Sequence, residues 1–356
     1  MPRIPFSVII KARRENYLLP ILLKECRTID SARNELRWLR ERAVRDSQSL
    51  SKAGWRGRLR SMCEMRSRGY PLQYILGDQP FGDLEILCRR GVLIPRSAIR
   101  VLKKRYFLLT TFDRPETESY TYQAAKLVCQ MALDRKYASN SPEQARPLRQ
   151  LEITGVDISP KALGLAQENL KHNLQLGQLE PSAATDIRFH RADVLGHGSD
   201  NSVPSIESIL QTHPNLGPTV TPPDEESGCD LLISNPPYIS QTEFRNGTTA
   251  RSVRRFEPKL ALVPPYSGSG MEDCMPEDIF YYRILTLSFK LKAKFTVLEC
   301  GDSNQANRVV ALHKRLASAE SGQFSAEVWP SREQDLAENG FHVTDGSRGV
   351  IIQSLR

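Results

Sequence analysis

Apolar residues recur every three or four positions between about Asn16 and Gly69, among arginines and glutamates. This spacing places them on one face of an amphipathic helix. The recurring positions are Leu18, Leu19, Leu22 and Leu23, and then Leu36, Leu39 and Ala43. Asp30 and Ser31 precede the second group, and we expect them to cap its helix. We therefore predict a small N-terminal helical domain over residues 1–69.

The pattern changes between Tyr70 and Arg96, where glycines and prolines separate short β-like runs. The clearest runs are Leu84–Leu87 and Val92–Ile94. Such punctuation is typical of a hairpin. We assign residues 70–118 to a hairpin linker.

From Leu151 onward, short apolar runs alternate with helical patterns, which predicts an open α/β sheet covered on both faces. The predicted strands are Ile153–Val156, Ile187–His190, Leu231–Ser234, Phe295–Glu299 and Gly349–Gln353, with a helix over Pro160–Asn173. An earlier helix is predicted around Thr121–Lys136. Between Gly196 and Cys229 the chain is rich in Pro, Ser, Gly, Asn and Thr, and we predict a disordered loop over residues 196–229.

Charge divides the chain of 356 residues into a basic front and an acidic back. Residues 1–110 carry 24 Lys and Arg against 10 Asp and Glu, whereas residues 111–356 carry 25 against 31. A basic front suits an anionic partner such as RNA, a ribosome or an acidic protein. An ordinary basic helical surface would give the same count.

Cysteine usage and hydropathy argue against a disulfide-rich, a metal-binding or a membrane-spanning protein. The seven cysteines are widely spaced without a CxxC pair, and the six histidines lack metal-ligand spacing, so we expect no disulfide framework and no metal. No apolar run approaches the roughly 20 residues that span a bilayer, and we expect no membrane attachment. Residues 1–14 contain arginines but no acid, which fits either a mitochondrial transit peptide or an ordinary basic N-terminus.

The segment most informative about chemistry is Asn235-Pro236-Pro237-Tyr238, which directly follows the apolar run Leu231–Ser234. Ligands of open α/β sheets bind just beyond the carboxyl ends of the strands. Two prolines stiffen the loop and leave free carbonyls. The Asn235 side-chain oxygen and the Pro236 carbonyl can accept the two hydrogens of a planar NH2 group, while the Tyr238 ring stacks on it. Taken alone, the tetrapeptide could also be a strand-ending turn.

Two aspartates suggest a nucleoside cofactor. Asp157 ends a predicted strand just before a helix with Ser159 as its cap and Pro160 in its first turn. An aspartate there can accept hydrogen bonds from both ribose hydroxyls. Asp193 follows the next predicted strand and could accept from an adenine amino group. We expect Asp157, Ile158, Asp193, Val194 and Asn235 to line one nucleoside pocket.

The tetrapeptide resembles that of amino methyltransferases, which methylate the NH2 group of adenine, cytosine or glutamine. The flanking segments resemble one family, the HemK/PrmC release-factor glutamine methyltransferases, in the same order and over most of residues 16–356. These segments are Pro71-Leu-Gln-Tyr-Ile-Leu-Gly77, Pro80-Phe-Gly82, Gly91-Val-Leu-Ile-Pro-Arg96, Glu257-Pro-Lys-Leu-Ala-Leu262 and Leu298-Glu-Cys-Gly-Asp302.

The resemblance implies a Class I, Rossmann-like methyltransferase domain over residues 119–356. It implies N5-methylation, with S-adenosyl-L-methionine, of the glutamine in the Gly-Gly-Gln motif of a peptide chain release factor. Asn235, Pro236, Pro237 and Tyr238 would be the catalytic residues, and the basic helical domain would bind the factor. We expect a monomer, located in the mitochondrial matrix or alternatively in the cytoplasm, near the ribosome or RNA.

Two departures from the family stand out. In the family, the residues that match Pro115-Glu116-Thr117-Glu118 directly follow the one that matches Arg96. Here the 18 residues of segment 97–114 lie between them. We interpret this segment as a retained intron or an inserted hairpin. No glycine lies between Val92 and Thr154. The first strand, glycine-rich loop and helix of the fold are therefore expected to be missing, since only glycines let backbone approach the methionine part of the cofactor.

Because that loop is missing, we expect the chain to bind the cofactor poorly or not at all. Two other functions stay open at this point. One is an adenine- or cytosine-directed nucleic-acid methyltransferase, which would share the tetrapeptide and the basic front. The other is a non-catalytic module that binds a release factor or the ribosome through its basic helices.

Overall fold

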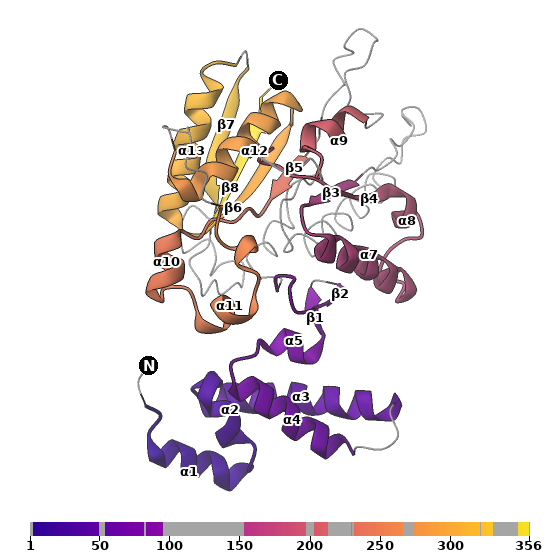
Figure 1. The fold of residues 1–356 in the computed structure, drawn as a ribbon, viewed down its shortest axis with the longest axis vertical. Coiled ribbons are helices and arrows are strands. Elements are labelled where there is room, and N and C mark those ends of the chain that lie inside the picture. Colours follow the sequence, from indigo (N-terminus) through magenta and orange to yellow (C-terminus); the bar gives the residue numbers. More distant parts are fainter. Residues whose placement is uncertain are drawn as a thin grey trace, which may run out of the picture. The chain divides into compact units, whose positions relative to one another are not determined.

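The computed structural model describes residues 3–49, 54–81, 83–94, 153–196, 203–212, 229, 231–265, 274–320, 322–329 and 348–355 (Figure 1). The chain forms two compact units. The first comprises Met1–Gln79, Leu87–Arg90 and Thr249–Glu257, and the second comprises Pro80–Ile86, Gly91–Thr248 and Pro258–Arg356. The predicted helix around 121–136 and the segment 97–114 lie outside the described residues.

The first unit is a cluster of helices around a leucine-rich core. Its helices are α1 (Phe6–Glu15), α2 (Leu19–Cys26), α3 (Ile29–Ser49), α4 (Trp55–Ser67), α5 (Leu72–Leu76) and α11 (Arg251–Phe256). Leu22, Leu39 and Cys63 are fully buried in this core. The helical spacing read from Leu18 onward is thus confirmed. None of the described helices is both long and apolar enough to cross a membrane.

Two local expectations for this unit are corrected. Helix α1 falls in a stretch that the apolar spacing left without a helix, and its Ala12 is fully buried in the unit's core. Helix α3 begins at Ile29, and the Thr28 hydroxyl accepts the Ser31 N–H at 3.2 Å. Thr28 is therefore the cap, because Asp30 and Ser31 already lie inside the first turn.

A two-stranded hairpin of β1 (Asp78–Phe81) and β2 (Leu84–Leu87) follows α5. The Asn173 side chain binds both backbone groups of Glu85: its Oδ1 accepts the Glu85 N–H at 3.0 Å and its Nδ2 donates to the Glu85 carbonyl at 2.8 Å. The prediction of a strand at Val92–Ile94 was wrong. These residues are buried, but they reach burial by packing and not by strand pairing.

The second unit contains two groups of strands. Parallel strands β3 (Ile153–Asp157) and β4 (Ile187–Arg191) form one group. The other has the order β5 (Leu231–Ser234), β6 (Phe295–Cys300), β8 (Arg348–Ser354) and β7 (Phe324–Trp329), with β5 and β6 parallel and β8 antiparallel to both neighbours. The five predicted strands are confirmed, and β7 was not anticipated. Within the described residues no ladder joins β3 to β5.

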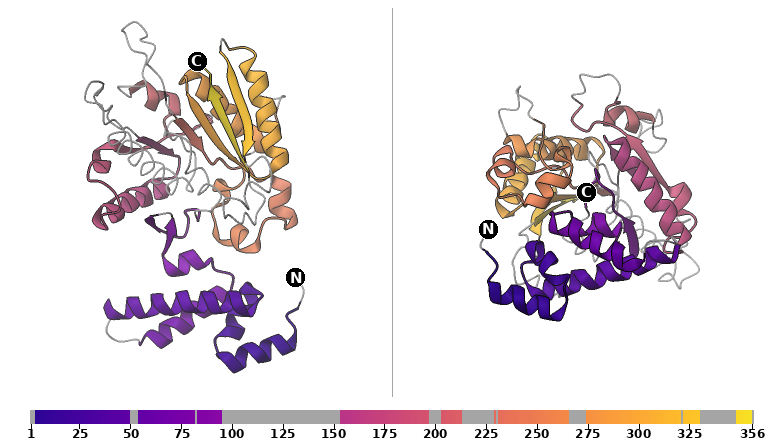
Figure 2. Two further views of the ribbon diagram at one scale, coloured as in Figure 1. Left: turned by 180° about the vertical axis from the view of Figure 1, so that it is seen from behind. Right: turned by 60° about the horizontal axis from the view of Figure 1, so that its bottom comes forward.

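Helices pack on both groups of strands. Helix α7 (Pro160–Gln175) lies against β3 and β4, and α13 (Ser303–Ala317) packs on β6, β7 and β8, as Figure 2 shows from behind. Helix α12 (Ile279–Lys290) packs beside α13. The other helical segments of this unit are α8 (Ala183–Asp186), α9 (Ile206–Thr212), α10 (Gln241–Asn246), η2 (Lys259–Ala261) and η3 (Pro276–Asp278).

The expectation of a disordered loop over residues 196–229 is corrected in part. Residues 206–212 form α9, and Ile206 is fully buried in the apolar cluster that also contains Val194. The Ile206 N–H donates to the Asp193 carbonyl at 3.2 Å, and the Asp193 N–H donates to the Pro204 carbonyl at 3.0 Å. The polar composition of the segment concealed one short helix, which is held by the buried Ile206, by Ile209 packed on the same cluster and by an ion pair between Glu207 and Arg283.

His313 of α13 gives the second unit a dependence on pH. Its ring stacks on Phe289 and meets Phe324 edge-on, and neither ring nitrogen has a hydrogen-bond partner among the described residues. Burial lowers the pKa of His313 from 6.5 to about 4. The unfolded chain therefore binds more protons than the folded chain between these two values, and stability falls as pH drops from about 6.5 to about 4.

We predict that His313→Leu removes this part of the acid sensitivity. The free energy of unfolding of the parent should fall by on the order of 2 kcal/mol more than that of the variant between neutral pH and pH about 4. Urea unfolding of the full chain at stepped pH measures the difference, with the exposed Lys314→Ala as control. Identical pH profiles for parent and His313→Leu would contradict the assignment.

Candidate functional site

The tetrapeptide Asn235-Pro236-Pro237-Tyr238 lies directly after the carboxyl end of β5, where the sequence placed it. Asn235 is 3% exposed, both prolines are buried, and Tyr238 is half-buried. The next residue, Ile239, donates its N–H to the Leu262 carbonyl at 2.9 Å. The loop is thus part of the packed interior at the strand end, as a rigid binding loop requires.

Tyr238 is fixed by groups at the end of the neighbouring strand, β6. Its hydroxyl donates to Oε1 of the buried Glu299 at 3.2 Å. Gly301 lies against the ring, and a β-carbon added there would stand 3.1 Å from a ring carbon of Tyr238 and 3.2 Å from Oε1 of Gln305. Since real β-carbons rarely come so close, the ring occupies space that only glycine leaves open.

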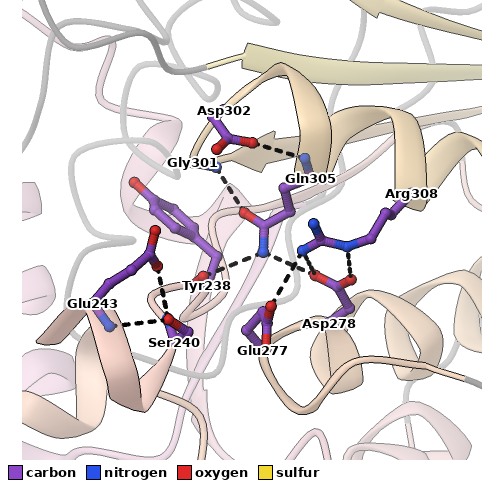
Figure 3. Close-up of polar contacts among 9 residues, drawn as sticks. All are labelled: Tyr238, Ser240, Glu243, Glu277, Asp278, Gly301, Asp302, Gln305 and Arg308. Carbon is purple, nitrogen blue, oxygen red and sulfur yellow. Dashed lines mark hydrogen bonds and ion pairs between the residues drawn. The ribbon is translucent and has the colours of Figure 1, made fainter.

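A buried amide joins the loop to the start of α13 (Figure 3). Gln305, 4% exposed, accepts the Gly301 N–H at 2.9 Å and donates from Nε2 to the Tyr238 carbonyl at 3.2 Å and to Asp278 Oδ1 at 2.9 Å. Arg308 binds both oxygens of Asp278, at 2.6 and 3.0 Å, and this hydrogen bonding raises the pKa of the guanidinium. The Tyr238 carbonyl, the Gly301 N–H and the side chains of Gln305, Asp278 and Arg308 thus form one hydrogen-bonded group.

Asp157 ends β3, and its carboxylate is 3% exposed. Its Oδ1 accepts the Ser159 N–H at 2.6 Å. Ser159 caps α7 by accepting the Ala162 N–H, and Pro160 is at the first helical position, as the sequence predicted. Ile158 lies in this turn, and its carbonyl accepts a hydrogen bond from Arg191 at 3.2 Å.

Asp193 follows β4 by two residues, and because Asp157 is paired with Arg191 in the β3–β4 register, both aspartates lie at the same ends of adjacent strands. Asp193 Oδ1 accepts the Leu195 N–H at 2.9 Å, and its side chain accepts no other hydrogen bond from the described part of the chain. Val194 is buried, and its carbonyl accepts from Arg283 Nε at 2.9 Å.

These positions fit one half of S-adenosylmethionine. Two buried carboxylates at the ends of adjacent parallel strands suit the hydroxyls and the amino group of a nucleoside. The glycine-rich turn that would admit the methionine half is not among the described residues, and the sequence has no glycine between Val92 and Thr154. Within the part of the chain that the structure describes, the residues thus fit the nucleoside half.

The sequence did not predict the residues that contact Tyr238, namely Glu299, Gly301 and Gln305, or Asp278, which binds the Gln305 amide. Leu298–Asp302 was noted only for its family resemblance. One local signal was present: Asp302 accepts the Gln305 N–H at 2.8 Å and caps α13, and an acidic residue followed three positions later by Gln marks a helix start. The contacts of the Gln305 side chain with Tyr238 and Asp278 are long-range and carry no local signal.

Parallel β3 and β4, parallel β5 and β6, and an antiparallel final pair, with the tetrapeptide at the end of β5, fit the Class I methyltransferase fold that the sequence resemblance implies. The probable MRF1 mitochondrial N(5)-glutamine methyltransferase mtq1 of Schizosaccharomyces pombe is 30% identical over 340 residues, covering 87% of this chain and 89% of the relative. The chain therefore belongs to the family of release factor N(5)-glutamine methyltransferases.

Two further relatives are also named as glutamine methyltransferases. The mitochondrial MRF1 N(5)-glutamine methyltransferase MTQ1 of Saccharomyces cerevisiae is 30% identical, covering 87% of this chain and 79% of the relative. The release factor glutamine methyltransferase of Chlorobaculum tepidum is 29% identical over 58% of this chain and 57% of its own length.

No family model matches the chain. Among solved structures, the N-terminal domain of human METTL16 aligns at 12% identity with a TM-score of 0.40, covering 90% of this chain and 94% of that structure.

We predict that Gly301→Ala strains the site. The added methyl group must displace the Tyr238 ring or the Gln305 amide, at a cost of about 1–3 kcal/mol in the free energy of unfolding. Gly164→Ala in α7 is the matched control, since a β-carbon added there would meet no atom within 4 Å, and it should raise stability by up to about 1 kcal/mol.

Denaturant unfolding of the full chain measures both changes. If Gly301→Ala proved as stable as the parent, the close packing of Tyr238 against Gly301 would be refuted.

Proposed function

We propose that this chain transfers a methyl group from S-adenosylmethionine to the side-chain nitrogen of the glutamine in the Gly-Gly-Gln motif of a mitochondrial release factor. The observation that carries the proposal is the buried tetrapeptide at the end of β5, whose tyrosine is held on two sides. The names of the relatives support the substrate and the compartment.

The loop offers the groups that a carboxamide requires. Asn235 Oδ1 and the Pro236 carbonyl accept the two N–H groups of the glutamine amide, and the Tyr238 ring packs on the amide plane. Because the prolines fix the backbone, these acceptors need no reorganisation when the substrate arrives. The amide nitrogen is thereby held in one orientation, and such positioning is the main contribution of the protein to the rate.

The cofactor would be held at its nucleoside end. Asp157 accepts from the ribose hydroxyls and Asp193 from the adenine amino group, with Ile158 and Val194 beside them. S-adenosylmethionine supplies a methyl group activated by its attachment to a positively charged sulfur. As the bond between the methyl carbon and the amide nitrogen forms, the carbon–sulfur bond would break and S-adenosylhomocysteine would leave. The nitrogen would pass its proton to water only afterwards, so the site does not require a strong general base.

The substrate test offers the chain three acceptors, namely a mitochondrial release factor, RNA and DNA, with tritiated S-adenosylmethionine in excess. Label should enter the release factor alone. Asn235→Ala should lower that incorporation by about 100-fold or more, because the amide loses one of its acceptors. Asn246→Ala, an exposed asparagine of α10, should leave incorporation unchanged. Label in nucleic acid would support the alternative methyltransferase, and binding without labelling would support a non-catalytic module.

Cofactor affinity tests the expected loss of the glycine-rich turn. We expect calorimetric titration of the full chain with S-adenosylmethionine to show weak binding, because no glycine lies between Val92 and Thr154, where the glycine-rich turn is expected. Asp157→Ala should weaken it further, to below detection. Binding with a dissociation constant in the low-micromolar range would show that residues 95–152 supply the missing contacts and would overturn the expectation.

A further inference from the structure

The Tyr238 carbonyl accepts a hydrogen bond from the Gln305 side chain. We propose that Gln305 is a positioning residue for methyl transfer, setting the place of the tetrapeptide's carbonyls and of the Tyr238 ring. This inference rests on the proposed function, because the tetrapeptide is the part of the site that would receive the glutamine amide. Gln305 itself would touch neither substrate nor cofactor.

The Gln305 amide uses both ends at once. Its oxygen accepts from Gly301 after β6, and its nitrogen donates to the Tyr238 carbonyl after β5. The two strand ends are therefore tied to each other through one side chain of α13. Since a β-carbon added at Gly301 would also lie 3.2 Å from the Gln305 oxygen, the same amide helps to define the space beside the Tyr238 ring.

Because of its two prolines, the tetrapeptide needs hydrogen bonds from groups outside the loop to hold its backbone in place. Pro236 and Pro237 have no N–H groups, so the tetrapeptide cannot hold itself by backbone donation at these positions. The described loop is instead fixed through Tyr238 and Ile239: the carbonyl by Gln305, the hydroxyl by Glu299 and the Ile239 N–H by Leu262. A shift of the Tyr238 carbonyl is transmitted directly to the stiff residues before it.

Within the described residues, the Gln305 nitrogen donates to two acceptors, the Tyr238 carbonyl and Asp278 Oδ1, and this favours an amide at position 305. Asp278 is 3% exposed, and Arg308 binds both of its oxygens, so its carboxylate is held in place. A carboxylate at position 305 would retain the bond from Gly301 but would face the Asp278 carboxylate and the Tyr238 carbonyl without a proton. Figure 3 shows the Gln305 amide between these partners.

The first test is kinetic and uses the full chain with a release factor as substrate. Gln305→Glu should lower kcat by about 10- to 100-fold, the effect of a misplacement of up to about 1 Å, with the KM for release factor within about twofold of the parent. Gln305→Met removes all three bonds without repulsion and should lie between the parent and Gln305→Glu. Val309→Ala, one turn further along α13 and fully buried, removes core packing and should leave kcat unchanged.

A second readout does not depend on the substrate. Hydrogen exchange of the Ile239 amide, followed by mass spectrometry of the peptide spanning the tetrapeptide, should become about tenfold faster in Gln305→Glu and in Gln305→Met. It should be unchanged in Val309→Ala. If the parent transfers no methyl group to release factor, the proposed function fails, and the exchange rates still decide whether Gln305 holds the loop.

The inference is overturned if Gln305→Glu keeps the parental kcat, or if exchange at Ile239 is the same in all four proteins. It is also overturned if Val309→Ala loses as much kcat as Gln305→Glu, because the effect would then follow general destabilisation of α13.

Discussion

The site depends on one constraint, a loop with two consecutive prolines at the end of a buried strand. Such a loop has few donors of its own and is fixed by the groups around it. Here the neighbouring strand end supplies Glu299 and Gly301, and the start of α13 supplies Gln305. Gly301, Gln305, the buried Asp278 and the partly exposed Arg308 form one chain of hydrogen bonds that reaches the Tyr238 carbonyl through Gln305.

The two halves of the site differ in how completely the chain provides them. The half that would receive the glutamine amide is assembled from β5, β6 and α13, which form one hydrogen-bonded and packed group. The half that would hold the nucleoside is at the ends of β3 and β4, where Asp157 and Asp193 lie. For the methionine half, the sequence has no glycine between Val92 and Thr154, where the glycine-rich turn is expected. Substrate chemistry and cofactor affinity are therefore separate properties of this chain.

Local signals predicted a large part of the fold and two parts of the site. Asp157, Ser159 and Pro160 form a strand end and helix cap within four residues, and Asn235–Tyr238 follows an unbroken apolar strand, so each could be read directly. Composition led to two wrong predictions. The polar segment around Ile206 contains a helix whose first residue is buried, and the apolar residues Val92–Ile94 are buried but do not form a strand. Gln305 could not be found, because its partners Asp278 and Tyr238 lie 27 and 67 residues away.

The most direct measurement is tandem mass spectrometry of the release factor after incubation with the full chain and excess S-adenosylmethionine. We predict a single methyl group on the side-chain nitrogen of the glutamine in the Gly-Gly-Gln motif. A methyl group on any other residue, or an unmodified motif under these conditions, would contradict the proposed reaction.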